Sequence, residues 1–92
     1  MEEMVEQIEL LLAQNDVQQL QEYLNNLNIS DVEILIGEFP EQGPHFIEIL
    51  SINRSVNVFR ILDFPVQERI LKKLSGSKIA ELINELPPDD RT

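Results

Sequence analysis

The sequence predicts an all-α protein built as a small solenoid, a right- or left-handed superhelix of short helical hairpins. Apolar residues recur every three or four positions along the chain. Prolines and glycines divide the chain into short segments, and none of these alternates like a half-buried strand. We therefore expect about seven helices in one domain spanning residues 1–92.

The first predicted helix covers the N-terminal stretch, where carboxylates lie largely on the polar face. Those in its first turns complement the positive end of the helix dipole. Asn15 or Asp16 can cap the helix that follows. The apolar positions are Met4, Val5, Ile8, Leu11 and Leu12 in the first helix, and Val17, Leu20, Leu24 and Leu27 in the second.

A third helix is predicted from the stretch SDVE at 30–33, which has the form of a capping box. This helix stops at Pro40, and Gly43 and Pro44 mark a turn before a fourth helix. The apolar positions are Val32, Leu35, Ile36 and Phe39 in the third helix, and Phe46, Ile47, Ile49 and Leu50 in the fourth.

Three more helices follow to the C-terminus. The sixth is predicted to start at Pro65, a residue favoured in the first turn. Ser75, Gly76 and Ser77 break the chain and cap the seventh. The apolar positions are Val56, Val58, Phe59, Ile61 and Leu62 in the fifth helix, Val66, Ile70, Leu71 and Leu74 in the sixth, and Ile79, Leu82, Ile83 and Leu86 in the seventh.

A serine precedes a proline by ten residues three times, at Ser30 and Pro40, Ser55 and Pro65, and Ser77 and Pro87. The copies are separated by 25 and then 22 residues, which is the length of two very short helices. The middle copy fits loosely, because its apolar positions are shifted by about one residue. Hairpins too short to bury a face alone stack side by side into a solenoid. By this pattern an eighth helix is expected to start after Pro87, where the chain looks cut.

The net charge of −10 is unevenly distributed. Residues 1–53 contain eleven carboxylates and no Lys or Arg, whereas residues 54–92 contain all seven basic residues and six acidic ones. Such a chain repels nucleic acid and anionic membrane surfaces, so neither is expected to contact it, and it attracts divalent cations and basic proteins. An ordinary solvated surface is the simplest interpretation of the charge alone. We interpret the basic strip of Arg69, Lys72 and Lys73 as a complement to a helix dipole rather than as a partner site.

The sequence lacks the features of an enzyme. Without cysteine there is no disulfide or thiolate metal site, and the three glycines are isolated, so no phosphate loop is formed. The single histidine, His45, is interpreted as an exposed loop or helix-start residue and not as a catalytic base. No EF-hand and no distinctive carboxylate pair is present. Without a signal peptide or a membrane-length segment, a cytoplasmic location is the default expectation.

The C-terminal stretch ILDFPVQERILKKLSGSKIAELINELPPDDRT resembles the cytosolic N-terminal domain of MgtE-type magnesium transporters. GEFPEQ at 37–42 looks like an earlier copy of the same phrase, so the likeness extends over nearly the whole chain. The residues that carry the resemblance are Leu62-Asp63 with Val66-Gln67, then Ala80-Glu81-Leu82-Ile83, then Pro88-Asp89-Asp90-Arg91.

The resemblance implies a regulatory domain of a longer protein, on the cytoplasmic side of the inner membrane. In the family, a pair of CBS domains, a connecting helix and a five-helix pore follow, usually as a homodimer. The resemblance also implies a magnesium sensor. At high Mg²⁺, ions between the acidic faces of this domain and the CBS domains hold them together and close the pore.

By position, the resemblance assigns Mg²⁺ binding to Asp89 and Asp90, which match a pair of aspartates that opens a helix in the family. Both can also be ordinary charges at a helix start. Asn57 stands where the family has a glutamate, and without that charge this ion site is in doubt. We expect the chain alone to bind Mg²⁺ weakly, at roughly millimolar level, because it supplies only part of each shared site.

Two other functions fit the sequence. Helical repeats of this kind also resemble part of the flagellar motor switch protein FliG, which would make the chain a protein-binding scaffold. A carboxylate-based enzyme fragment is the other, and it requires a pocket in which acids converge. We further expect self-association through apolar surface at Ile79, Leu82 and Ile83, which an eighth helix would otherwise cover.

Overall fold

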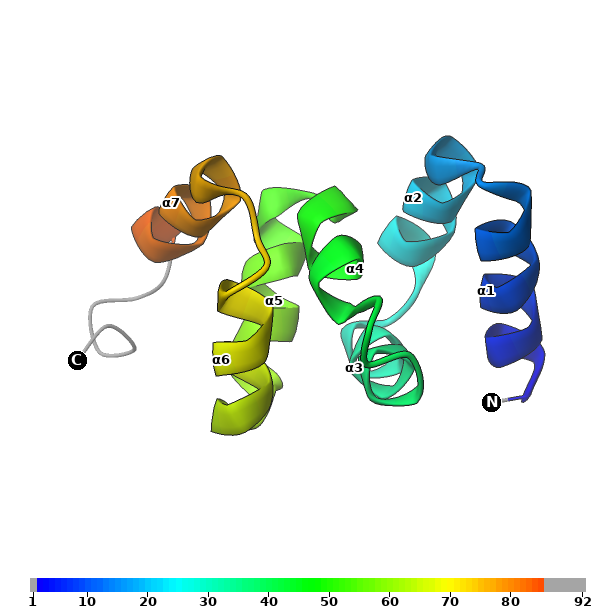
Figure 1. Cartoon of the computed structure of the whole chain (residues 1–92), viewed down its shortest axis with the longest axis horizontal. Coiled ribbons are helices and arrows are strands. Elements are labelled where there is room, and N and C mark those ends of the chain that lie inside the picture. Colours follow the sequence, from blue (N-terminus) through cyan, green and yellow to red (C-terminus); the bar gives the residue numbers. More distant parts are fainter. Residues whose placement is uncertain (1, 86–92) are drawn as a thin grey trace.

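The computed structural model describes residues 2–85, and all regular structure in that range is helical. The helices are α1 (Glu2–Gln14), α2 (Val17–Asn26), α3 (Ile29–Glu38), α4 (Gly43–Ile49), α5 (Ile52–Ile61), α6 (Phe64–Leu71) and α7 (Gly76–Glu85) (Figure 1). The predicted all-α class and the number of helices are confirmed for this range. The predicted start of an eighth helix after Pro87 lies outside the described residues.

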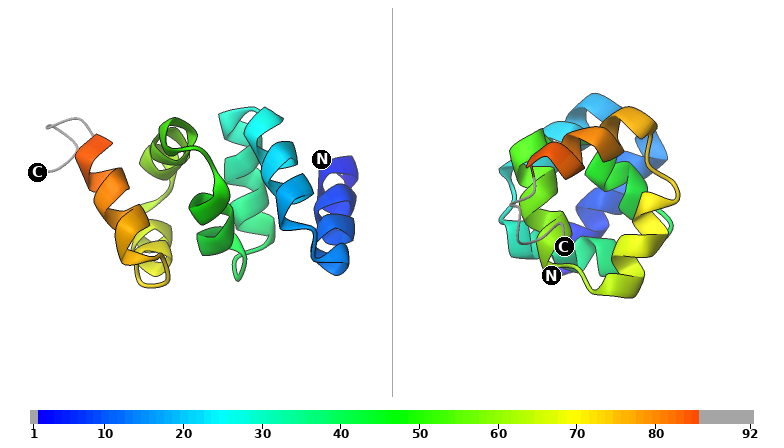
Figure 2. Two further views of the ribbon diagram at one scale, coloured as in Figure 1. Left: turned by 90° about the horizontal axis from the view of Figure 1, so that it is seen from above. Right: turned by 90° about the vertical axis from the view of Figure 1, so that its left-hand side faces the viewer.

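The helices form two rows along an elongated molecule of 38 × 23 × 22 Å. In one row α1, α3, α5 and α7 pack on one another in turn, and in the other α2, α4 and α6 do the same. Figure 2 shows that α1 and α7 lie at opposite ends of the stack. Each hairpin therefore contacts mainly its neighbours, which is the arrangement of a small solenoid.

The hydrophobic core runs along the molecule between the two rows. Its fully buried members include Ile8, Leu24, Leu35, Phe46, Val58 and Leu82. Phe39 meets Phe46 edge to face, with ring centroids 6.2 Å apart. Gly43 is needed for close approach, because a Cβ there would lie 3.2 Å from Ile36 Cγ2.

Three residues assigned to apolar faces are exposed in the structure: Val17, Ile61 and Ile83. Val17 and Ile61 are the first residue of α2 and the last of α5, so both lie at helix ends. The surface expected to drive self-association is smaller than predicted. Leu82 is 1% exposed because α7 packs on α5, whereas Ile83 is 49% exposed.

The structure confirms the predicted caps of α2 and α7 and corrects that of α3. At α7, Lys78 N donates to Ser75 Oγ at 3.2 Å. Asp16 caps α2, since its Oδ1 accepts a hydrogen bond from Gln19 N at 3.1 Å. The predicted capping box at 30–33 is wrong, because the N-cap is Asn28, two residues before Ser30, and α3 begins at Ile29. The backbone amides of Asp31 and Val32 bond to the Asn28 carbonyl, at 3.0 and 3.1 Å, which makes Asn28 the N-cap residue. Half-buried Ile29 packs on the core from this first turn.

The structure also explains why the middle copy of the repeat fits loosely. Ser30 and Ser77 are the second residues of α3 and α7, whereas Ser55 is the fourth residue of α5. The residues that immediately precede α5 and α7 are Ser51 and Ser75. Ser51 N donates to Asn25 Oδ1 at 3.0 Å, and Ser75 N donates to Glu48 Oε1 at 2.9 Å, so each ties a helix start to the preceding hairpin. Ser55 is buried inside α5, where its hydroxyl bonds to the carbonyls of Ile47 and Leu50 at 3.0 and 3.1 Å.

Two basic residues 24 positions apart cap the carboxyl ends of earlier helices. Arg54 Nη2 donates to the carbonyl of Leu24, at 3.1 Å, and to that of Leu27, at the end of α2. Lys78, which is 5% exposed, donates from Nζ to the Leu50 carbonyl at the end of α4, at 2.8 Å. The carboxyl end of a helix carries carbonyls without a partner and a negative partial charge. A cationic side chain stabilises it by donating a hydrogen bond to a carbonyl and by offsetting the negative charge.

Replacing Arg54 by Met is expected to lower the free energy of unfolding by about 1–3 kcal/mol, because the Leu27 carbonyl loses a charged donor. Methionine keeps much of the aliphatic stem in place. Urea unfolding followed by circular dichroism measures the change. The matched control is Arg69→Met, which removes the same charge from an exposed position on α6 and is expected to change stability by less than about 0.5 kcal/mol. An equal loss in both variants would contradict the capping role.

Candidate functional site

Of the three predicted metal ligands, Asn57 is described and lies on the exposed side of α5. It lines a groove of about 370 Å³ between α5 and the end of α7, together with Asn53, Val56, Arg60 and Glu85. Asp89 and Asp90 lie outside the described residues. The structure therefore places a carboxylate, Glu85, in the same groove as Asn57, which the sequence interpretation did not foresee.

The side chains that line the groove at Asn57 have opposing effects on a divalent cation. The Asn57 amide oxygen and the Glu85 carboxylate are oxygen ligands of the kind that Mg²⁺ takes. The guanidinium of Arg60 lines the same groove and opposes a cation there by charge repulsion. Asn57 alone supplies no charge to offset this repulsion.

Within residues 2–85, no group of three or more His, Cys, Asp or Glu side chains could hold a metal ion. Mg²⁺ keeps several of its waters and is usually bound through one or two carboxylates. A magnesium site completed by a second surface thus does not require such a group on this chain.

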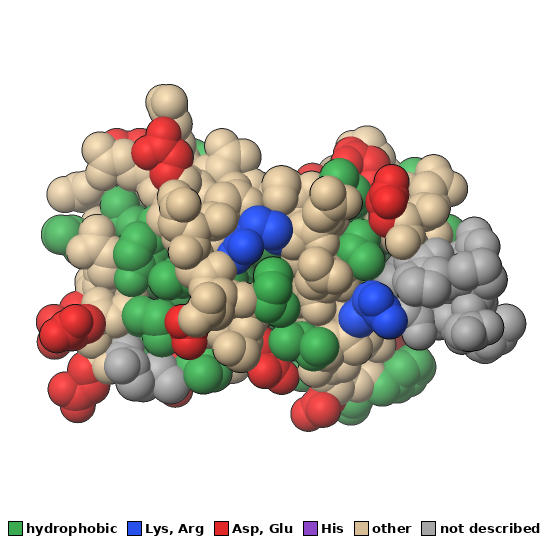
Figure 3. All heavy atoms as spheres, turned by 180° about the vertical axis from the view of Figure 1, so that it is seen from behind, with side chains coloured by type: hydrophobic (Ala, Val, Ile, Leu, Met, Phe, Trp, Pro, Cys, Tyr) green, Lys and Arg blue, Asp and Glu red, His purple; other side chains and the backbone are tan. Residues whose placement is uncertain are grey.

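The uneven charge of the sequence becomes an uneven charge along the molecule, because the helices stack in chain order. Residues 2–53, from α1 to the start of α5, carry eleven carboxylates and no Lys or Arg. In Figure 3, seen from behind, Asp and Glu side chains lie along most of the length of the molecule, while the Lys and Arg side chains lie near the middle and towards the end opposite α1. One end of the solenoid is therefore a surface of unbalanced negative charge.

The pKa of Tyr23, a half-buried residue of α2, is affected by the carboxylates of this acidic end. Burial raises the pKa of Tyr23 above its ordinary value, and the nearby carboxylates of Asp31 and Glu3 raise this pKa further. Both carboxylates disfavour a phenolate, since it would add a like charge to their field. Asp31 belongs to α3 and Glu3 to α1. The electric field at Tyr23 therefore arises from the packing of several helices and not from one helix alone.

His45 is the third residue of α4, which confirms its position at a helix start, but it is half-buried and not exposed as predicted. It lines a groove of about 300 Å³ in which Asp16 is the one carboxylate. Asp16 already accepts the capping hydrogen bond of α2. The lining of this groove does not bring acids together.

The comparisons with known proteins gave one family. The model of the MgtE intracellular N domain matches residues 27–92, which takes in α3 to α7 and leaves α1 and α2 outside. Neither the curated proteins nor the solved structures contained a match. Among the described residues, no helix combines the length and the apolar character that crossing a membrane requires.

Absorbance titration of Tyr23, the single tyrosine, is expected to give a pKa above the ordinary value of 10.0. Because the folded state holds this proton more tightly than the unfolded state, the stabilising contribution is complete below the ordinary pKa. It is lost as pH rises through the raised value. The free energy of unfolding is therefore expected to fall above roughly pH 10.

The substitution Asp31→Asn is expected to lower the pKa of Tyr23 without restoring it to the ordinary value, because burial is the larger cause. Glu81→Gln, on α7 at the far end of the molecule, removes the same charge and serves as the control. If both substitutions lower the pKa of Tyr23 equally, net charge and not the local field governs this residue.

Proposed function

The chain belongs to the MgtE intracellular N domain family, and on that premise we propose that it is the magnesium-sensing regulatory domain of a magnesium transporter. The observation that carries this proposal is the family match over residues 27–92. Under it, the domain lies on the cytoplasmic side of the inner membrane, in a parent chain with CBS domains and a pore that assembles as a homodimer. Regulation, and not catalysis, is the proposed role.

The acidic surface supplies the physical basis of sensing. Two facing surfaces rich in carboxylates repel each other, and a divalent cation held between them converts this repulsion into attraction. We propose that CBS domains of the same parent chain provide the second surface. A ligand shifts an equilibrium only by its difference in affinity for the two states. Mg²⁺ therefore favours the closed arrangement only where that arrangement adds oxygen ligands that the open one lacks.

Asp89 and Asp90 are the proposed principal ligands, on the family pattern that they match. Asn57 is proposed as a secondary ligand, through its amide oxygen. The groove in which it lies contains Glu85, which favours a cation, and Arg60, which disfavours one. For this reason we assign the larger share of Mg²⁺ binding to the two aspartates.

A protein-binding scaffold is the alternative function. The two-row stack of short helices supports it, because solenoids of this kind present extended surfaces to other proteins. The scaffold predicts no dependence on Mg²⁺, so the experiments below separate the two proposals.

The chain alone is expected to bind Mg²⁺ with a Kd of roughly millimolar, because it supplies only part of each proposed site. Calorimetry or NMR titration with MgCl₂ measures the affinity, with KCl at matched ionic strength as the reference. Asp89→Ala is expected to weaken binding further, while Glu9→Ala, which removes the same charge from α1, leaves it nearly unchanged. Saturation at micromolar Mg²⁺ would show a self-contained site and contradict the shared one.

In the full-length parent protein in membranes, Mg²⁺ is expected to protect the linker after this domain from protease at millimolar concentration. The reason is that the bridged arrangement holds the domain against its neighbour. Asp89→Ala should shift protection to higher Mg²⁺, and the Glu9→Ala control should not. Cleavage that does not respond to Mg²⁺ would favour the scaffold.

A further inference from the structure

A groove runs between the α1–α2 hairpin and the turn from α3 to α4. It consists of the groove of about 300 Å³ at His45 and a second one of about 360 Å³, which adjoin because Leu12 and Gln42 line both. The left view of Figure 2 shows the turn from α1 to α2 and the turn from α3 to α4 at the same edge of the stack. We call the combined feature the hairpin groove; residues 11–20 line one side of it and residues 38–45 the other.

Apolar side chains line the hairpin groove from both sides. Leu12 and Val17 contribute from α1 and α2, and Phe39 and Pro40 from the opposite turn. Val17 is 50% exposed, although it is an apolar residue. Phe39 is half-buried and packs edge to face on the buried Phe46, so its ring is held in place. The groove is therefore a formed surface whose apolar area is favourable to cover.

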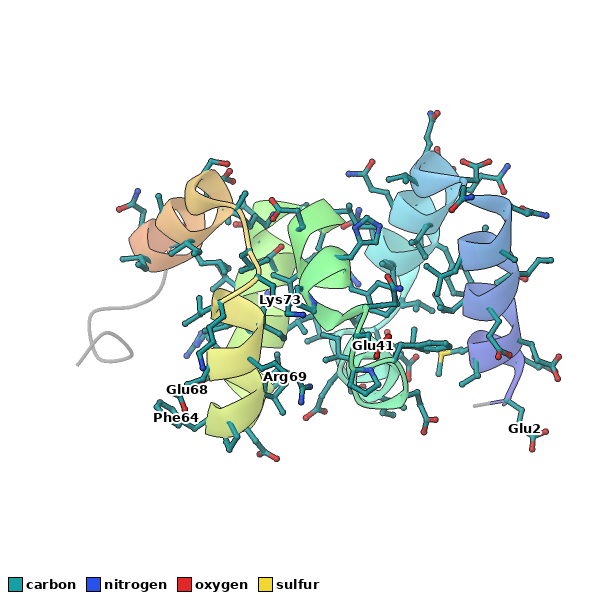
Figure 4. All side chains as sticks on the ribbon, in the orientation of Figure 1. Glu2, Glu41, Phe64, Glu68, Arg69 and Lys73 are labelled. Carbon is teal, nitrogen blue, oxygen red and sulfur yellow. The ribbon has the colours of Figure 1, made fainter. Side chains whose placement is uncertain are left out.

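Negative charge surrounds these apolar walls. The carboxylates of Asp16, Glu38 and Glu41 belong to the lining of the groove. Glu38 and Glu41 are exposed, and Figure 4 shows Glu41 at the turn between α3 and α4. Both sides of the groove come from residues 2–53, which contain no Lys or Arg. The lining thus joins apolar contact with negative charge that no cation of the groove balances.

We propose that the hairpin groove is the docking site for a basic amphipathic helix of a partner protein. A helix with apolar residues at i, i+3, i+4 and i+7 lays them in a groove of this kind. Lys and Arg residues beside that apolar stripe then meet Asp16, Glu38 and Glu41. Charge complementarity selects this partner, because an acidic helix would bring like charges together at the groove.

A second copy of this chain is a poorer occupant. Its strip of exposed cations is Arg69, Lys72 and Lys73. Ile70, in the middle of the strip, is buried in the core of its own chain. The exposed ring of Phe64 projects from the opposite side of α6 from Arg69 (Figure 4). The strip therefore lacks an exposed apolar stripe beside it, and we assign the groove to a different protein.

The docking site is separate from the proposed magnesium sensing. The family model matches residues 27–92, so α1 and α2, which form one side of the hairpin groove, lie outside the match. The groove at Asn57 lies between α5 and the end of α7, and α7 is at the opposite end of the stack from α1 (Figure 2). Docking can therefore be measured without Mg²⁺, and its failure leaves the proposed function untouched.

Fluorescence anisotropy of a labelled synthetic helix of Leu and Lys, with Leu at the spacing given above, tests the proposal on the 92-residue chain in EDTA. We expect a Kd of roughly 10–100 μM at low salt, which rises with salt because exposed charges are screened. Two control peptides replace every Leu by Gln or every Lys by Glu. Each is expected to bind at least roughly 10-fold more weakly, because each keeps only one of the two complementary features.

The variant with Glu38→Gln and Glu41→Gln tests the charge of the groove. It is expected to weaken binding of the Leu and Lys peptide by roughly 5-fold to 10-fold. The matched control carries Glu68→Gln and Glu81→Gln, which remove the same charge from exposed positions on α6 and α7. This control is expected to change the Kd by less than about 2-fold.

The substitution Val17→Thr tests the apolar wall, because it exchanges a methyl group for a hydroxyl with little change of shape. It is expected to weaken binding by roughly 3-fold. Ile61→Thr, at a residue of similar exposure (45%) at the end of α5, is the control and should leave the Kd unchanged. Circular dichroism checks that each variant is folded.

Three results would overturn the proposal. A Leu and Lys peptide that does not bind at up to about 1 mM has no docking site on this chain. Equal weakening by the two pairs of Glu→Gln substitutions would show that net charge, and not the groove, attracts the peptide. A Gln-substituted peptide that binds as tightly as the Leu peptide would leave the apolar walls without a role.

Discussion

The capping of helix carboxyl ends by cations from later helices is the interaction on which the rest of this solenoid depends. The described helices have 7 to 13 residues, and each leaves its last four carbonyls without a partner inside the helix. In helices so short, these groups are a large share of the backbone. Arg54 and Lys78 bond to carbonyls at the ends of α2 and α4. Two neutral glutamines also donate to carbonyls in the last turns of helices. Gln21 of α2 bonds to the Ile49 carbonyl at 2.8 Å, and Gln67 of α6 bonds to that of Phe59 at 2.7 Å.

This capping also determines where positive charge is available. Arg54 and Lys78 donate to backbone carbonyls, so neither presents its full charge at the surface. Upstream of Arg54 the chain has no cation at all. The C-terminal end of α1 is instead closed by Asn15 in a left-handed conformation, with φ 55°, whose amide bonds to the Leu12 carbonyl. The carboxyl end of α1 is thus closed without a cation, and the negative charge of this helix is left unbalanced.

The sequence predicts the parts of this structure that depend on local patterns. Apolar spacing gives the all-α class and the number of helices, and Pro40 and Pro65 mark boundaries to within a residue or two. Contacts between residues far apart in the chain have no such signal. Arg54 and the Leu27 carbonyl are 27 residues apart. From the sequence alone, Arg54 is therefore interpreted as an ordinary surface charge. The burial of Ser55 inside α5 likewise has no local signal, because it depends on the packing of α5 against α4.

The candidate site could be predicted only as far as the family pattern extends. Asn57 was found by position, whereas Glu85 and Arg60 join it in one groove only because α7 folds against α5. No local pattern in the sequence carries this contact, since it depends on how two separate hairpins pack. The structure therefore adds the two charges that decide how well the groove suits a cation.

The six carboxylates of residues 2–26 need a different explanation from those near the groove at Asn57. Charges exposed to solvent are screened over about 10 Å at 0.1 M salt, whereas α1 and α7 lie at opposite ends of a molecule 38 Å long. The acidic end therefore exerts little force on a cation in that groove. It acts on whatever lies directly beside it, which is a second domain or a partner protein.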